Sequence, residues 1–241
     1  MALSDADKLM RIRRFYQRAE AGPVSGGHGV LLDGKTAKTA GGAVLAAPTP
    51  ALAEALAGEW QAQVEFIDFA RMPATRLAFT VIDRGGPVHA DLAKEVRRYA
   101  GADTLCYPAE GPRGLAERQD ALWTPWRDWA KAELGLRFEP AGGALHHTQP
   151  AETLAAAEAL AAALDPYQLA GLVFACGLYG SAILALAVQR RALHGVEAFD
   201  LSRAEEAYQA EQWGLDAEAE ARTEALRGEA AMVERWFAAL A

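Results

Sequence analysis

The sequence has few cysteines and no excess of positive charge, and each shortage excludes a class of protein. The two cysteines, Cys106 and Cys176, lie in apolar surroundings without metal-ligand spacing. Such cysteines are typical of reduced core residues in a cytosol-like compartment. The net charge is −8 at neutral pH, which is the wrong sign for a nucleic-acid partner. We therefore expect no disulfide framework and no nucleic acid.

Patterns that carry catalysis or bind metals are also missing. The five histidines are scattered, apart from the pair His146-His147, whose adjacent side chains point in different directions. No order of Ser, His and Asp, or of Cys and His, supports a nucleophile. The sequence therefore supports no nucleophile, metal site or dinucleotide site, and we predict no catalytic residue, no metal and no cofactor.

Long apolar runs are absent except for one, from Leu169 to Val188, which contains no charge. A helix that is apolar on all sides must be buried in a protein core or in a bilayer, and about 20 residues suffice for a membrane span. Alanine and glycine make up much of this run, and Tyr179 and Ser181 lie in its middle. Its modest hydropathy favours one continuous core helix over stable membrane insertion. Small residues such as Gly180 predict a close approach of neighbouring helices.

The first third of the chain predicts a mixture of helices and short strands. A helix is expected over residues 4–20, broken by the Gly/Pro/Ser-rich run 21–27. Two β-like runs follow at 30–32 and 44–45, and Asp33-Gly34 after the first is a strong hairpin signal. Further helices are expected from Thr49-Pro50 to Val64 and over 75–83.

The rest of the chain has a helical pattern almost throughout. We expect helices over residues 88–100, 115–134, 152–164, 169–188, 197–213 and 216–240. Trp123, Trp126 and Trp129 recur at helical spacing and are expected to pack in the core. The fold class is therefore α+β. A small, β-rich mixed α/β N-terminal domain (residues 1–85) is followed by an all-α helical C-terminal domain (residues 86–241).

One segment matches a nucleotide-binding motif letter for letter. Gly29–Thr36 satisfies the phosphate-loop pattern G-x-x-x-x-G-K-[ST]. That loop needs a strand before it, a helix after it and backbone amides wrapped around a phosphate. Here the interior is Val-Leu-Leu, and the residues after Thr36 have no amphipathic helical pattern. The segment favours a hairpin, and a nucleotide-binding enzyme remains the alternative hypothesis.

The negative charge is concentrated near the C-terminal end of the sequence. Residues 197–241 hold eleven acidic residues and four arginines, so they account for seven of the eight net negative charges. If residues 204–213 are helical, one side of that helix combines acidic, aromatic and amide groups. Such a strip is typical of a protein-binding helix. The predicted partner-binding residues are Glu205, Glu206, Tyr208, Gln209, Gln212 and Trp213, with the ring of Trp213 expected to be buried.

Ordered motifs across nearly the whole chain resemble one family, the assembly chaperones that hold the alpha subunit of the soluble catalytic sector of the ATP synthase. The motifs that carry the resemblance are Glu59-Trp60, residues 72–78 with Ile82-Asp83, residues 99–107, Gln119, residues 123–125, residues 179–187, residues 205–209 and residues 213–216. Several motifs in a fixed order are much more specific than any one of them.

The resemblance implies both a fold and a role. The fold is a small mixed or β-rich N-terminal domain followed by a helical domain. The role is a non-enzymatic chaperone that shields the unassembled alpha subunit from aggregation until the beta subunit replaces the chaperone. Because no long extension of the mitochondrial kind precedes the first helix, we expect a monomeric, cytoplasmic bacterial protein. Eukaryotic relatives are expected in the mitochondrial matrix.

Overall fold

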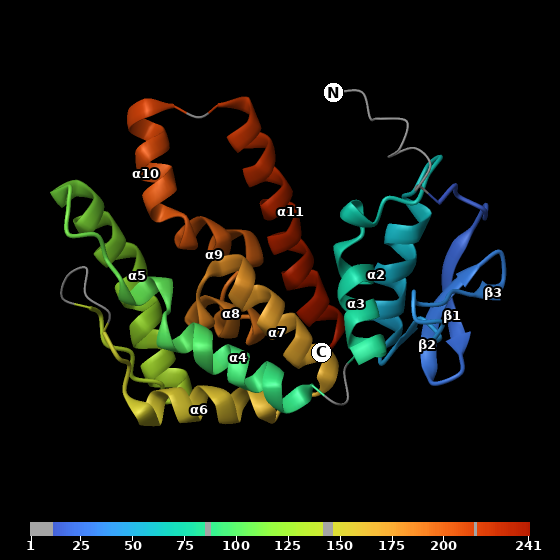
Figure 1. Ribbon diagram of the computed structural model, residues 1–241, viewed down its shortest axis with the longest axis horizontal. Helices are drawn as coiled ribbons and strands as arrows, with labels where there is room; N and C mark the ends of the chain where they lie inside the picture. The colour runs from blue at the N-terminus through green and yellow to red at the C-terminus, as the bar shows by residue number, and fades with distance from the viewer. Residues whose placement is uncertain (1–11, 85–87, 142–146, 215) are drawn as a thin grey trace. The chain divides into compact units, whose positions relative to one another are not determined.

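The computed structural model describes residues 12–84, 88–141, 147–214 and 216–241. The chain divides between Gly85 and Gly86 into two compact units, and residues 238–241 belong to the first unit. An antiparallel sheet lies in the first unit, and the second unit is helical (Figure 1). The expected α+β class is confirmed.

The sheet of the first unit is built around its second strand. Strands β1 (Ala19–Val24) and β2 (Gly27–Leu32) pair along their full length, with Ala19 opposite Leu32. The short strands β3 (Lys35–Thr36) and β4 (Ala46–Ala47) also pair with β2. Val30 and Leu32 point into the core on alternate positions of β2, as a sheet with one buried face requires.

Two helices complete the first unit. Helix α2 (Pro50–Gln61) starts as predicted, with the Thr49 hydroxyl accepting from Leu52 N, and it buries Leu56 and Trp60. A 3₁₀ turn, η1 (Phe69–Arg71), leads into α3 (Pro73–Arg84). The Thr49 hydroxyl also donates to the carbonyl of Ala239, 190 residues away, at 2.5 Å.

The motif Glu59-Trp60 has a structural explanation. The carboxylate of Glu59 accepts hydrogen bonds from Ala74 N at 2.9 Å and from Thr75 N at 2.7 Å, at the start of α3. These are two of the amides that a helix leaves without internal partners. One side chain of α2 therefore fixes where α3 begins.

The helix predicted over residues 4–20 is wrong where the structure describes it. Residues 12–18 are not helical, Arg13 forms a β-bridge with Phe66, and β1 begins at Ala19. Residues 4–11 lie outside the described residues. The run 21–27 is not a break between elements, because it holds most of β1 and the turn to β2. Its glycine content hid the strand.

The turn predicted at Asp33-Gly34 is confirmed, although the strand that follows it is Lys35–Thr36 and not the run expected at 44–45. Asp33 and Gly34 both have positive φ, 49° and 79°, as a tight turn between twisted strands requires. The turn joins β2 to β3, and Lys35 lies exposed in β3. The segment Gly29–Thr36 is therefore strand, turn and strand, and not a phosphate-binding loop leading into a helix.

The helices of the second unit begin with α4 (His89–Gly101) and a 3₁₀ turn, η2 (Thr104–Cys106). The long helix α5 (Arg113–Leu134) and then α6 (Ala151–Ala162) follow. The remaining helices are α7 (Pro166–Tyr179), α8 (Ala182–Gln189), α9 (Gly195–Ser202), α10 (Ala204–Trp213) and α11 (Ala217–Ala239). Of the three tryptophans of α5, Trp123 is buried and the other two are half-buried.

The apolar run from Leu169 to Val188 is core, as predicted, but it is two helices and not one. Gly180 adopts φ +63° at the end of α7, and the hydroxyl of Ser181 accepts from Leu184 N to begin α8. Residues 182–188 are all buried, and α8 packs against α4, α5, α7 and α9 (Figure 1). No helix among the described residues combines the length and apolarity needed to cross a membrane.

Replacing Gly180 at the junction of α7 and α8 should destabilise the folded protein. Substitution Gly180→Ala puts a Cβ in a left-handed conformation and 2.7 Å from Thr104 Oγ1. We expect a loss of at least about 1 kcal/mol in the free energy of unfolding, and a larger loss for Gly180→Leu. The matched control is Gly228→Ala within α11, where a Cβ has open space and the change should be neutral or stabilising. Urea denaturation measures both, and equal stabilities would contradict this account.

Lys35 should make no contribution to nucleotide binding. Its side chain is exposed on a short strand, so Lys35→Ala should change the free energy of unfolding by no more than about 0.5 kcal/mol. Thermal melting with and without ATP provides the measurement, because a ligand that binds the native state raises the melting temperature. A rise caused by ATP and abolished by Lys35→Ala would restore the alternative hypothesis.

Candidate functional site

Helix α10, which carries the predicted partner-binding residues, lies beside α5 (Figure 1). Arg118 of α5 donates to both carboxylate oxygens of Glu211, at 2.7 and 2.8 Å. Nearer the start of α10, the ring of Tyr208 lies close to Gly114, where a Cβ would meet the Tyr208 hydroxyl at 3.4 Å. These contacts orient α10 and leave a different part of its surface open.

A cavity of about 530 Å³ opens at the first turns of α10. Its walls come from the segment after α4, from α5, from the junction of α7 and α8, and from the junction of α9 and α10. The lining residues are Ala102, Thr104, Tyr107, Gln119, Trp123, Gly177, Tyr179, Gly180, Ser202, Arg203, Glu205, Glu206 and Gln209. We call this the α10 cavity. Its volume is that of a site for a small ligand or a few residues of a partner chain.

The acidic residues of α10 differ in how their charge is balanced. Glu206 forms an ion pair with Arg203 at 2.8 Å, and Glu211 forms one with Arg118. Glu205 is exposed, and its carboxylate accepts a hydrogen bond from the neutral amide of Gln209 at 3.1 Å. Among the described residues, Glu205 has no cationic partner. The α10 cavity therefore carries one uncompensated negative charge at its edge.

The structure brings together half of the predicted partner-binding residues. Glu205, Glu206 and Gln209 line the α10 cavity, whereas Tyr208 is half-buried and faces Gly114. Gln212 is exposed at the end of the helix and does not line the cavity.

The expected burial of Trp213 is wrong, because its side chain is 80% exposed. All four residues from Glu211 to Gly214 are exposed, so none of the described elements covers the final turn of α10. Gly214, with φ +79°, then ends the helix. Trp213 presents an apolar surface to solvent and does not anchor α10.

Sequence reasoning missed the opposite wall of the cavity. Gln119 and Trp123 are four residues apart on α5, and this spacing was the available signal that they share a face. The other walls come from segments far apart in the chain, so no spacing within one element could identify them.

A buried carboxylate anchors the wall that contains Ala102 and Thr104. Asp103 is fully buried and accepts from Leu105 N and from Ile183 N, both at 3.0 Å. Ser181 and Ala182 N, at the start of α8, also donate to it. Burial raises the pKa of Asp103 to about 6, although these hydrogen bonds oppose the shift. Thr104 adds bonds from its N and Oγ1 to the carbonyl of Gly180.

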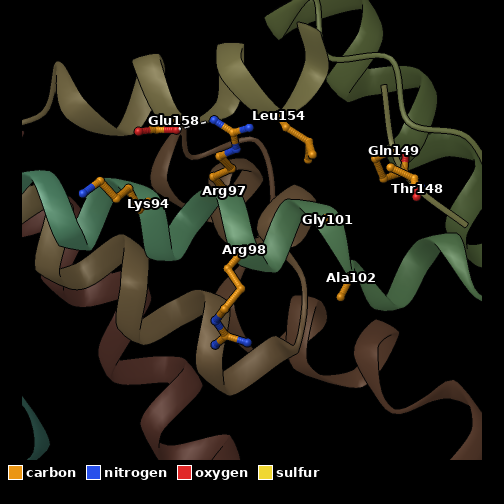
Figure 2. Close-up of a pocket in the computed structure, with 9 residues that line it drawn as sticks. All are labelled: Lys94, Arg97, Arg98, Gly101, Ala102, Thr148, Gln149, Leu154 and Glu158. Atoms are coloured by element: carbon orange, nitrogen blue, oxygen red, sulfur yellow. Dashed lines mark hydrogen bonds and ion pairs between the residues drawn. The ribbon is translucent and has the colours of Figure 1, made fainter. Parts of the chain in front are cut away.

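A second cavity, of about 660 Å³, lies between α4 and α6 and contains three basic side chains (Figure 2). Arg97 points toward Glu158 on α6 and pairs with it at 2.9 Å, whereas Arg98 is turned away from α6. Arg98 pairs with Glu95 at 2.7 Å, and Lys94 with Asp91 at 3.0 Å. Each cation already has a carboxylate partner, so this cavity offers no uncompensated charge to a ligand.

Comparison with known proteins gives consistent matches. A family model described as ATP12 chaperone protein matches residues 13–131. The structure is similar to Atp12 from Paracoccus denitrificans, with TM-score 0.87 and 37% identity over 95% of this chain and 99% of that chain. It is also similar to the Atu1473 protein from Agrobacterium tumefaciens, with TM-score 0.88 and 38% identity over 95% of this chain and 86% of that chain.

The raised pKa of Asp103 should make stability depend on pH in a specific direction. The native state binds the Asp103 proton more tightly than the unfolded state, so this group's contribution to stability falls as pH rises from about 4 to about 6. Asp103→Asn removes the titration. As pH rises from about 4 to about 6, the free energy of unfolding of the Asp103→Asn variant minus that of wild type should therefore increase. Parallel urea titrations at several pH values provide the measurement, and a constant or opposite difference would contradict the expectation.

Proposed function

Because the chain belongs to the ATP12 chaperone protein family, we propose that it binds the unassembled alpha subunit of the ATP synthase and prevents its aggregation until the beta subunit replaces it. The family supplies the chaperone role. The alpha subunit as client, and the face that holds it, are our proposals.

The observation that supports α10 as the client-binding face is the uncompensated charge of Glu205. An exposed carboxylate without a cationic partner among the described residues contributes little to the fold. At an interface, the same carboxylate would attract a basic group of the client and repel an acidic one, which sets specificity. Trp213, exposed on the last turn, adds an aromatic surface of the kind enriched in protein interfaces.

The proposed role is binding and not catalysis. The one nucleotide-binding pattern in the sequence, Gly29–Thr36, forms a hairpin, in which Gly29 lies within β2 and a Cβ there would meet the Leu45 carbonyl at 2.5 Å. Those residues pair in a sheet and do not surround an anion. We propose that the protein acts as a cytoplasmic monomer, through surface complementarity and without a cofactor.

Reversing the charge of Glu205 should abolish protection without affecting the fold. We expect Glu205→Lys to melt like wild type, because Glu205 is exposed and makes one neutral hydrogen bond. A lysine there would replace attraction with repulsion, which costs several kcal/mol, roughly a hundredfold or more in affinity. An aggregation assay with the isolated alpha subunit measures protection, and a melting curve measures the fold.

The matched control is Glu224→Lys, an exposed position on α11 that does not line the α10 cavity. It changes the net charge by the same amount and should protect the alpha subunit fully. Full protection by Glu205→Lys, or a collapse of its melting temperature, would show that Glu205 does not have the role proposed here.

A further inference from the structure

Gln119 brings to the α10 cavity an amide group of which the fold uses only the oxygen. Gln119 is 1% exposed and lines the cavity. Its Oε1 accepts from the backbone N of Ala109 at 2.6 Å, and this bond fixes which end of the amide is oxygen. Its Nε2 has no hydrogen-bond partner among the described residues. An unpaired donor on the wall of a cavity suits an acceptor supplied by a ligand.

Tyr179 also lines the cavity, and its buried hydroxyl has no hydrogen-bond partner among the described residues. Other polar groups of the walls are satisfied internally. The indole N–H of Trp123 donates to the carbonyl of Leu201 at 2.9 Å. The hydroxyl of Ser202 donates to the carbonyl of Phe199 at 2.7 Å. Thr104 and Arg203 are engaged as described above. The cavity walls therefore hold two unpaired hydrogen-bonding groups, Gln119 Nε2 and the Tyr179 hydroxyl, and one uncompensated negative charge, from Glu205.

A metal ion does not fit this pair of groups. No cluster of three or more His, Cys, Asp or Glu side chains occurs in the part of the chain that the structure describes. An amide N–H also cannot bind a cation. The complementary ligand has a carbonyl oxygen for Gln119 and a positive charge for Glu205, joined by an apolar stem that suits the ring of Trp123 in the same cavity wall. A lysine or arginine residue within a peptide has these three parts.

Building on the proposed function, we propose that the α10 cavity receives a lysine or arginine residue of the client, with its main-chain carbonyl accepting from Gln119 Nε2 and its charged end beside Glu205. The carbonyl must be free, and carbonyls within a helix are already bonded to their own backbone. The client segment is therefore extended, or it is the last turn of a helix. Gln119 lies on α5 and is therefore a specificity-determining residue outside the set predicted on α10.

The first experiment locates the client segment. A photoreactive p-benzoylphenylalanine replaces Gln209, at the cavity edge, or Glu224, on α11, in the full chain. Each variant is irradiated with the isolated alpha subunit, and cross-linked peptides are identified by mass spectrometry. We expect the probe at 209 to capture one segment that contains a lysine or arginine, and the probe at 224 not to capture it.

The second experiment is a double-mutant cycle between the captured segment and the cavity. Each basic residue of the segment is changed to methionine in the alpha subunit, and its affinity is measured for wild type and for Glu205→Gln. One such change should weaken binding to wild type about tenfold or more, and weaken binding to Glu205→Gln much less. Gln119→Met should also weaken binding, with a melting curve to check the fold. The Glu205→Gln cycle remains decisive if Gln119→Met does not fold.

The outcomes separate this inference from the function on which it rests. Failure of the alpha subunit to bind wild type at all would overturn the proposed function. Binding without capture at position 209, capture of a segment that lacks lysine and arginine, or additive effects for every basic residue would overturn the cavity proposal and leave the chaperone role in place. Coupling to Glu205, with weaker binding by a folded Gln119→Met, would establish the basic residue as the occupant.

Discussion

The second unit depends on one buried carboxylate that joins two distant segments. Asp103 lies between α4 and α5, yet its oxygens accept hydrogen bonds from the start of α8, eighty residues later in the chain. A helix beginning in an apolar core has amide groups that water cannot reach, and they need an acceptor from the protein. Asp103 supplies it and is itself stabilised by these donors. The next residue, Thr104, donates from its N and Oγ1 to the carbonyl of Gly180, so the core and one wall of the α10 cavity are fixed together.

The sequence was informative where one element determines its own structure, and uninformative where distant elements meet. Thr49 and Asp33-Gly34 act within a few residues, so the start of α2 and the β2–β3 turn could be predicted. The break at Gly180 could not, because a glycine in an apolar run is equally compatible with close helix packing and with a left-handed helix end. The α10 cavity brings together four separate parts of the chain, and only Glu205, Glu206 and Gln209 were accessible to reasoning from a single helix.

The charges of the second unit follow a pattern that bears on how a chaperone distinguishes its client. The cations around the cavity between α4 and α6 are paired, and so are Glu206 and Glu211 on α10. Internal pairing reduces nonspecific attraction to other charged proteins, which a strongly acidic surface would otherwise show toward basic partners. An unpaired carboxylate at the edge of a cavity whose walls also hold unpaired hydrogen-bonding groups is a more selective feature than negative charge alone.

The hydrogen bond from Thr49 to the carbonyl of Ala239 has a consequence for the order of events during synthesis. The hairpins of the first unit are local, and their strands can pair soon after leaving the ribosome. However, residues 238–241 belong to that unit, and the ribosome produces them after all of the second unit. At about 5–20 residues per second, the first unit waits roughly ten seconds or more for its final contact. The unit whose translation begins first is therefore completed last.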